Sequence, residues 1–206
     1  MKIIHRRFLA PLRAPLLTTL LLSMSGLVNA AIDVPSGKYV LENTHGYISF
    51  SYSHLGFSTP HVGFNTFDVN LDFDAEAPEK STISVSIDAN SVDSRVEEFD
   101  GHLVGDRFFD TANHPTITFV ATGIELGEAD KATITGDLTI KGQTHPVTLN
   151  ATLNKAGTHP MLKKPVMGFN AETTVKRSLW GLGYAAPMVS DEVNLFITVE
   201  LQKADG

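Results

Sequence analysis

The chain of 206 residues contains no cysteine. No disulfide can therefore form, no thiolate can ligate a metal ion, and no cysteine side chain can carry a lipid anchor. Small secreted domains often depend on disulfides, but a domain of this length buries enough apolar surface to fold without them. The absence of cysteine thus excludes disulfide-rich and cysteine-ligated zinc proteins without arguing against secretion.

Basic side chains are also scarce. Four of the 16 Lys and Arg residues lie within residues 1–30, whereas all 23 Asp and Glu residues lie beyond them. The remaining chain therefore has 12 basic and 23 acidic side chains and a formal charge of −11. Because nucleic-acid binding depends on the neutralisation of phosphates by Lys and Arg, we expect no nucleic-acid partner.

A long apolar run occurs near the start of the chain, at residues 16–28. It follows four basic side chains, Lys2, Arg6, Arg7 and Arg13, and ends in the small-residue sequence VNA before Ala31. This arrangement is typical of a secretory signal peptide, and the run is too short to span a bilayer stably. We predict that residues 1–30 are removed after Ala30 and that residues 31–206 form one periplasmic domain.

Histidine patterns typical of metal sites are missing. The sequence has no His-x-His pair and no His-x-x-x-His helical pair. A weakly supported metal hypothesis is that His54 approaches His61, or His45, across a hairpin. We therefore predict no metal site and no cofactor.

The sequence offers few groups for catalysis. Ser178 lies in KRSLW, without the flanking glycines of a nucleophile elbow. Asp100, His102 and Asp106 are acid/base candidates within DGHLVGDRFFD, residues 100–110. That segment also has the pattern of a helix end that leads into a buried loop, with its two adjacent phenylalanines plugging apolar space. We favour this structural interpretation and predict that the protein is not an enzyme.

Apolar and polar residues alternate through most of the chain after residue 46. For example, Ile48, Phe50, Tyr52 and His54 share one face of a predicted strand, with polar residues between them. We count about nine strand segments, at residues 38–42, 47–54, 67–73, 82–89, 117–119, 134–140, 147–153, 166–175 and 193–201. Many are separated by short turns rich in Gly, Asp, Asn or Pro. The pattern predicts an all-β meander that forms a barrel or a sandwich.

One segment breaks this period. Glu97 follows Ser94 at the spacing of a capping box. The apolar residues that then fall at helical spacing are Val96, Phe99 and Leu103, and Gly105 is positioned to end the helix. We expect one short amphipathic helix that packs its apolar face across an open end of the β-structure.

Longer motifs extend in order along nearly the whole mature chain. They are SFSYSHLGFSTPHVGFNTFDVNLDFD, SVDS, HLVGDRFFDTANHPTITF, GDLTIKGQTHPVTLNATL, GFNAETTVKRSLWGL and VSDEVNLFITVEL. Together they resemble the YceI-like family of periplasmic polyisoprenoid-binding proteins. The resemblance implies an antiparallel lipocalin-like β-barrel whose interior receives a long apolar chain, such as a polyisoprenoid, a quinone tail or a fatty-acid derivative. The sequence departs from the usual family pattern at His45-Gly46 and at Trp180, and these differences concern the identity of the ligand more than the fold.

The candidate ligand-binding residues are large side chains of the apolar faces. They are Ile48, Phe50, Tyr52, Phe67, Phe73, Ile87, Phe119, Leu138 and Phe169, with Phe108, Phe109 and Trp180 near one end. Tyr52 and His54 could also bond a polar head group. Arg177 could fork two hydrogen bonds to a pyrophosphate, and its alternative is an ion pair with Asp93 or Asp191. Each apolar candidate has ordinary core packing as its alternative.

We therefore expect a periplasmic protein that holds a long-chain amphiphilic lipid and carries or stores it. The alternative is a non-enzymatic envelope interaction module whose barrel is packed with side chains. Transient contact with a membrane or with envelope proteins stays open at this point, as does a homodimer formed through an exposed edge strand.

Overall fold

The structure is a computed structural model that describes residues 32–205. The predicted signal peptide, residues 1–30, lies outside the described residues. The described residues contain the strands β1 (Gly37–Leu41), β2 (Tyr47–His54), β3 (His61–Phe64), β4 (Phe67–Phe73), β5 (Thr82–Asp88), β6 (Val92–Asp93), β7 (Thr116–Leu126), β8 (Lys131–Ile140), β9 (Gln143–Thr158), β10 (Pro165–Lys176) and β11 (Val189–Lys203). They also contain the helix α1 (Glu97–Leu103) and the 3₁₀ turns η1 (Pro78–Lys80), η2 (Ala89–Ser91) and η3 (Arg177–Trp180).

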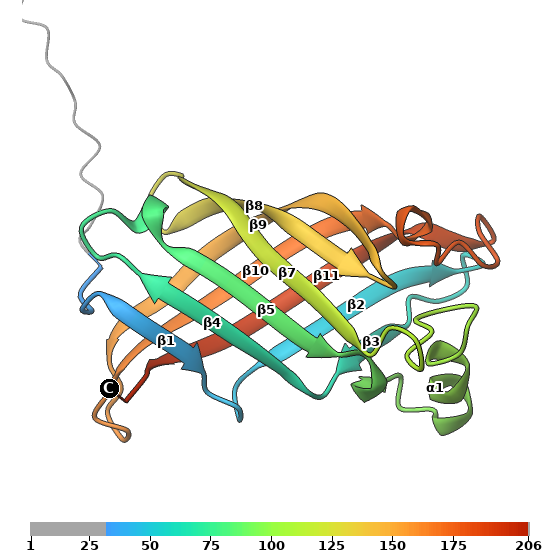
Figure 1. Cartoon of the computed structure of the whole chain (residues 1–206), viewed down its shortest axis with the longest axis horizontal. Coiled ribbons are helices and arrows are strands. Elements are labelled where there is room, and N and C mark those ends of the chain that lie inside the picture. The colour runs from blue at the N-terminus through green and yellow to red at the C-terminus, as the bar shows by residue number, and fades with distance from the viewer. Residues whose placement is uncertain (1–31, 206) are drawn as a thin grey trace, which may run out of the picture.

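Eight antiparallel strands close into a barrel in the order β1, β4, β5, β7, β8, β9, β10, β11 (Figure 1). The ring closes where β1 pairs with the end of β11, so that Leu41 lies opposite Leu201. The earlier part of β11 pairs instead with β2, which continues into β3 and β6. The predicted all-β antiparallel barrel is therefore confirmed.

The nine expected strand segments are all present, and β3 and β6 are two further strands that the alternation did not predict. β3 has four residues, and Val62 and Phe64 are its only two buried side chains. β6 has two residues. Segments this short show too few alternations to stand out from loops, so their pairing depends on neighbouring strands.

Alternation in the strands produces the barrel interior. In β4, for example, Val69, Leu71 and Phe73 are buried, whereas Asp68 and Asn70 are exposed. Burial of each such apolar side chain contributes about 1.5–3 kcal/mol. The buried residues form two clusters, one toward the α1 end of the barrel and one toward the end where β1 begins and β11 ends.

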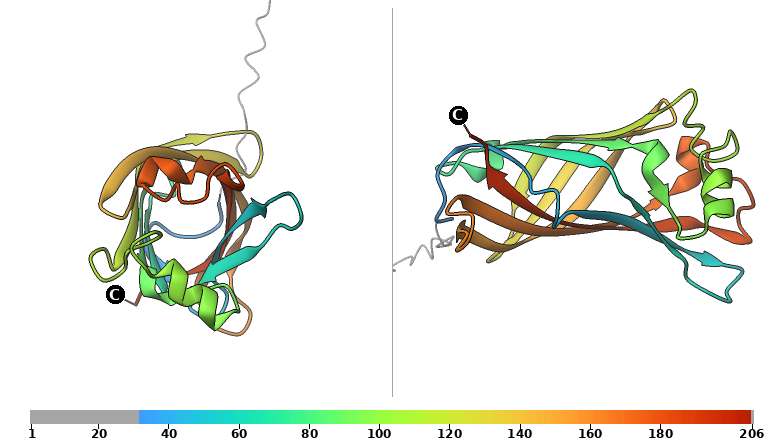
Figure 2. Two further views of the ribbon diagram at one scale, coloured as in Figure 1. Left: turned by 90° about the vertical axis from the view of Figure 1, so that its right-hand side faces the viewer. Right: turned by 90° about the horizontal axis from the view of Figure 1, so that it is seen from below.

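The helix α1 lies at one end of the barrel, as expected, but the predicted capping box does not form (Figure 2). The Oγ of Ser94 bonds the backbone of Val96, and the N–H of Ser94 donates to Oδ1 of Asp100 at 2.7 Å. Asp100 therefore occupies the capping role that we assigned to Glu97. Val96 is exposed rather than part of the apolar face, so that the helix packs through Phe99 and Leu103.

Candidate ligand-binding cavity

The barrel encloses a cavity of about 720 Å³. Its lining is almost wholly apolar and comes from strands all around the barrel. This volume lies in the range of about 300–1,000 Å³ that small-molecule sites occupy in proteins. The barrel is therefore not filled by its own side chains, whereas the alternative of an envelope interaction module stays a prediction.

The structure brings together all but one of the predicted ligand-binding side chains on this lining. Those that line the cavity are Ile48, Phe50, Tyr52, His54, Phe73, Ile87, Phe108, Phe109, Phe119, Leu138, Phe169, Arg177 and Trp180. The exception is Phe67, which packs at the junction of the two clusters. Its ring lies beside Gly46, where a Cβ would be 3.1 Å from Cζ of Phe67. The Phe67 ring thus packs against the turn between β1 and β2, and for this reason the ring does not reach the cavity.

Many aliphatic residues of the lining were not among the predicted ligand-binding residues. They include Ile83, Val85, Ile124, Ile134, Val147, Leu149, Leu153, Ala171, Val175, Leu195 and Ile197. Several of these already stood on the apolar faces of the predicted strands, so alternation itself was the signal that could have found them. Aromatic size was the weaker criterion, because a cavity wall needs small side chains where the ligand passes.

Polar side chains line both ends of the cavity, with Ser81, Asp130 and Lys131 toward the opposite end and a larger group toward the α1 end. Tyr52, His54, His102, Arg177 and Tyr184 all line the cavity. Burial raises the pKa of Tyr52, and the nearby positive charge of Arg177 opposes that rise. The Tyr52 hydroxyl makes no hydrogen bond to residues 32–205 and is thus available to a ligand.

Arg177 is held by backbone carbonyl groups rather than by a carboxylate. Its Nε donates to Ser190 O at 2.9 Å and its Nη2 to Val189 O at 2.9 Å. Nη1 donates to the carbonyls of Leu182 and Tyr184. The expected ion pair with Asp93 or Asp191 is absent from the described residues. Burial lowers the pKa of Arg177, and the four carbonyls compensate the buried charge.

Aromatic rings lie around the cavity at this end. Trp180, in η3, is 1% exposed and donates its indole N–H to Leu138 O at 3.0 Å. Phe109 contacts Phe64 edge-on, with ring centroids 5.5 Å apart. Phe108 contacts Tyr184 edge-on at 5.8 Å. Seen along the barrel, α1 and η3 lie on opposite sides of its mouth (Figure 2). The segment DGHLVGDRFFD is therefore part of the architecture of the mouth.

The catalytic candidates do not converge. Oγ of Ser178 donates to Oδ2 of Asp191 at 2.7 Å, and no histidine bonds Ser178 among residues 32–205. Asp100 accepts the N–H of Ser94, and His102 packs edge-on against Phe99. Each of these side chains therefore has a contact that suits a structural role.

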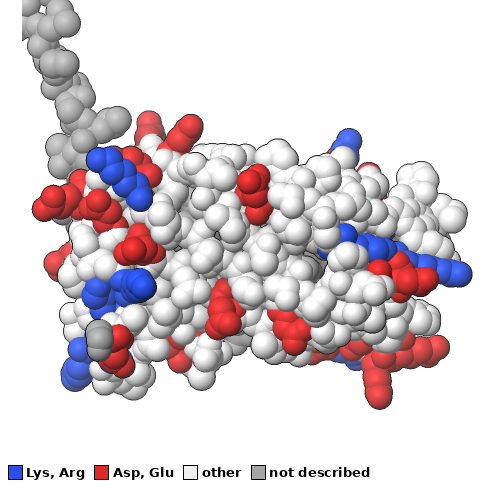
Figure 3. Space-filling model, in the orientation of Figure 1, with Lys and Arg blue, Asp and Glu red and all other residues white. Residues whose placement is uncertain are grey.

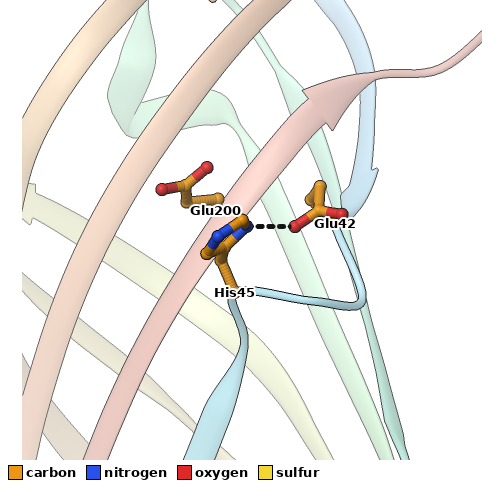
Figure 4. A group of neighbouring side chains, drawn as sticks. All are labelled: Glu42, His45 and Glu200. Atoms are coloured by element: carbon orange, nitrogen blue, oxygen red, sulfur yellow. Dashed lines mark hydrogen bonds and ion pairs between the residues drawn. The ribbon is translucent and has the colours of Figure 1, made fainter. Parts of the chain in front are cut away.

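A group that could hold a metal ion lies outside the lining of the cavity, where β1 and β11 close the barrel (Figure 4). It consists of Glu42, His45 and Glu200, whose possible ligand atoms lie within 4.8 Å of one another. The N–H of Glu42 donates to the carbonyl of Glu200 at 2.8 Å, which fixes the two segments side by side. The hypothesis from the sequence was that histidines converge across the β2–β3 hairpin. The observed group is different, since it contains neither His54 nor His61.

In this group the imidazole of His45 already has a partner. Its Nδ1 lies 2.6 Å from Oε2 of Glu42, and the hydroxyl of Thr44 donates to the same carboxylate. Burial raises the pKa of Glu42, but the hydrogen bonds from Thr44 and His45 outweigh it and lower the pKa overall. A metal ion would have to displace these contacts.

Within residues 32–205, no helix has the length and apolar character needed to cross a bilayer.

Comparison with known sequences identifies relatives along most of the chain. The sequence profile of the YceI-like domain matches residues 39–201. The chain is 35% identical over 185 residues to Protein YceI of Escherichia coli O157:H7, covering 86% of this chain and 96% of that protein. It is 34% identical over 181 residues to a UPF0312 protein of Azotobacter vinelandii, covering 87% and 94%. The family resemblance seen in the motifs is thus confirmed.

Solved structures show the same barrel. A YceI protein of Campylobacter jejuni is 28% identical, with a TM-score of 0.68 over 74% of this chain and 90% of that one. BcnA of Burkholderia cenocepacia is 23% identical, with a TM-score of 0.71 over 78% and 98%. A polyisoprenoid binding domain from Saccharophagus degradans is 13% identical, with a TM-score of 0.60 over 82% and 100%. The last two likenesses concern the fold alone.

Proposed function

This chain belongs to the YceI-like domain family, and we propose that it binds one long-chain amphiphilic lipid in the barrel and carries or stores it. The ligand class is a polyisoprenoid, a quinone-type lipid or a fatty-acid derivative. The observation that carries the proposal is the apolar cavity of about 720 Å³ inside a closed barrel. A relative of the same fold is described as a polyisoprenoid binding domain, which supports this ligand class.

The energetics favour a long apolar chain. Burial of each methylene contributes about 0.8 kcal/mol, so that a chain of five isoprene units gains well over ~10 kcal/mol before the cost of ordering it. A wall of apolar side chains is sufficient for this, and no catalytic group is required. We therefore propose a binding protein without enzymatic activity.

The side chains of the wall would contact the apolar chain, and the polar side chains toward the α1 end would take the head group. The Tyr52 hydroxyl is the first candidate, because it lies on the lining without a partner among the described residues. His54 lies farther along the same strand. Arg177 uses four of the five N–H donors of a guanidinium on carbonyls, which leaves one for a ligand oxygen. A polar group that makes one or two hydrogen bonds suits this end.

We propose that the protein acts in the periplasm. The proposed signal peptide, residues 1–30, would direct it there, and residues 31–206 would form the binding domain. In an aqueous compartment, an apolar barrel interior removes the lipid's apolar surface from water, which would otherwise favour aggregation of the lipid.

Native mass spectrometry tests the proposal. The protein would be purified gently from a bacterial envelope, and any bound molecule would be extracted into organic solvent and identified. We expect a stoichiometric adduct that releases a prenyl or acyl lipid. A clean apo mass, in a protein that also takes up no added prenyl lipid, would contradict the proposal.

A further inference from the structure

Exposed apolar side chains border the mouth of the cavity at the α1 end. Between β2 and β3, loop 55–60 exposes Leu55 and Phe57, and between η3 and β11 the chain exposes Tyr184 and Met188. Together with Leu179 of η3, we call these side chains the apolar rim. Phe57 is 89% exposed and Met188 is 67% exposed. The rest of the described chain therefore leaves them to solvent or to a partner.

The two loops form one surface. The N–H of Leu55 donates to the carbonyl of Met188 at 3.1 Å, and His54 pairs with Val189 at the adjoining strand ends. Both His54 and Val189 line the cavity. The apolar rim thus continues directly from the apolar interior onto the outer surface.

The rim is held in place from both sides. Arg177 donates to four carbonyl groups within residues 182–190, which surround its guanidinium. From the loop after α1, the guanidinium of Arg107 lies 5.1 Å from the ring centroid of Tyr184 and donates to its hydroxyl at 3.3 Å. These contacts hold the 182–190 part of the rim, so that little ordering of that part is required when it meets a partner.

The loops that carry the apolar rim lack charged residues, although α1 and the loop after it, at the same end, contain several. Residues 55–60 (LGFSTP) and 178–190 (SLWGLGYAAPMVS) contain no Asp, Glu, Lys or Arg. The turns at the opposite end, DAEAPEKS (74–81), GEADK (127–131) and HPMLKK (159–164), contain several of them. Figure 3 shows an uncharged tip where residues 178–190 lie, with charged side chains both at the opposite end and beside the tip, toward α1. Loops 55–60 and 178–190 could therefore enter an apolar phase to a shallow depth without desolvating charged residues of their own.

We propose that the apolar rim docks the mouth of the barrel on the surface of a lipid bilayer, where the lipid passes between membrane and cavity. The inference rests on the proposed lipid binding, because a membrane is where such a ligand resides. Residues 31–206 carry a formal charge of −11, as counted above, so attraction to anionic lipids cannot hold the protein there. Shallow insertion of apolar side chains must provide the binding.

Vesicle co-flotation tests the docking. The mature protein would be floated with uncharged phosphatidylcholine vesicles, alongside a Phe57→Ser/Met188→Ser variant and a Met161→Ser control. Met161 is 81% exposed but lies in the β9–β10 connection at the opposite end. We expect wild type and control to float with the vesicles at low and high salt alike, and the double variant to lose at least about fivefold of its bound fraction. Melting temperatures of all three should agree, because the substituted side chains are exposed.

Transfer of a fluorescent prenyl lipid separates this inference from the proposed function. From vesicles, the double variant should load the lipid at least about fivefold more slowly than wild type, whereas both should bind a water-soluble short-chain analogue equally. Wild type that binds the analogue but never floats with vesicles would overturn the docking and favour a protein partner at the rim, leaving lipid binding intact. Wild type that floats but binds neither lipid would instead overturn the proposed function.

Discussion

The side chain of Phe119 in β7 lies directly over Gly136 in the neighbouring strand β8. A Cβ built at Gly136 would clash with the Phe119 ring and would lie 2.6 Å from the carbonyl oxygen of Val120. Phe119 lines the cavity, so the missing side chain at position 136 sets where this aromatic part of the wall can lie. The position of one glycine therefore shapes the interior of the barrel.

We expect Gly136→Ala to destabilise the fold by about 1–3 kcal/mol, because the added methyl group must displace an aromatic ring and a backbone carbonyl. Gly123, in β7, is the matched control, since a Cβ there meets nothing within 4 Å. Urea unfolding of both variants measures the difference. Equal stabilities for Gly136→Ala and Gly123→Ala would show that the ring moves aside freely.

Phe109→Ala should lower the free energy of unfolding by about 3 kcal/mol. The Phe109 ring is buried between Phe50 and Phe64, where its removal leaves a cavity that the neighbours cannot fill. Phe57→Ala removes the same group from an exposed loop and should change stability by less than about 0.5 kcal/mol. Thermal and urea unfolding report both values, and an unchanged melting point for Phe109→Ala would contradict the burial.

Ala171→Trp should abolish uptake of a prenyl lipid while the protein still folds. Ala171 lines the cavity from β10, and a large side chain there would occupy the path of the ligand. Asn170→Trp, one residue earlier, points outward from the same strand and should bind as wild type does. Fluorescent-lipid titration compares the two. Normal binding by a folded Ala171→Trp protein would place the ligand elsewhere.

The bond between Ser178 and Asp191 predicts a pH dependence. Hydrogen bonds from the Ser178 side chain and backbone lower the pKa of Asp191. A carboxyl whose pKa is lowered on folding stabilises the native state above its unfolded pKa, about 3.8, and this stability is lost as the pH falls through the lower native pKa. Ser178→Ala should therefore cost about 1 kcal/mol at pH 7 and less at pH 3.

Urea unfolding of wild type and Ser178→Ala at both pH values provides the measurement. Ser53→Ala is a suitable reference, because Ser53 is also exposed but its contact to Ser190 uses its backbone N–H rather than its side chain. Its cost should not change with pH. A cost for Ser178→Ala that is the same at pH 7 and pH 3 would argue against the carboxylate as its partner.

Helical spacing indicated α1 correctly, but its cap could not be read from the sequence. Ser94 and Glu97 match a capping box, yet Asp100 reaches back to the N–H of Ser94. Arg95 adopts a positive φ of 67°, which turns the chain before the helix starts at Glu97. Several local hydrogen-bonding patterns suit such a sequence, and the packing of Phe99 and Leu103 on the barrel selects among them.

For the candidate site, the contacts of Arg177 and Phe67 are the ones that could not be predicted from the sequence. The sequence places Arg177 at a strand end in an acidic chain, which favours a carboxylate partner, but the fold surrounds the guanidinium with carbonyls from residues 182–190. Phe67 shares the apolar face of β4 with Phe73, yet the turn at Gly46 takes up its ring. The first outcome depends on how residues 182–190 fold back around Arg177 and the second on where the turn at Gly46 meets β4, and strand alternation encodes neither.

The sequence by itself determined which residues form strands and which face of each is apolar, because side chains alternate across a strand with a period of two. It also determined the family, through motifs spread along the chain. Only the tertiary structure decided that β1 and β11 close the ring, that about 720 Å³ inside stays unfilled, and that uncharged loops meet at one mouth. These features depend on strand register and on packing between distant segments, which no local pattern encodes.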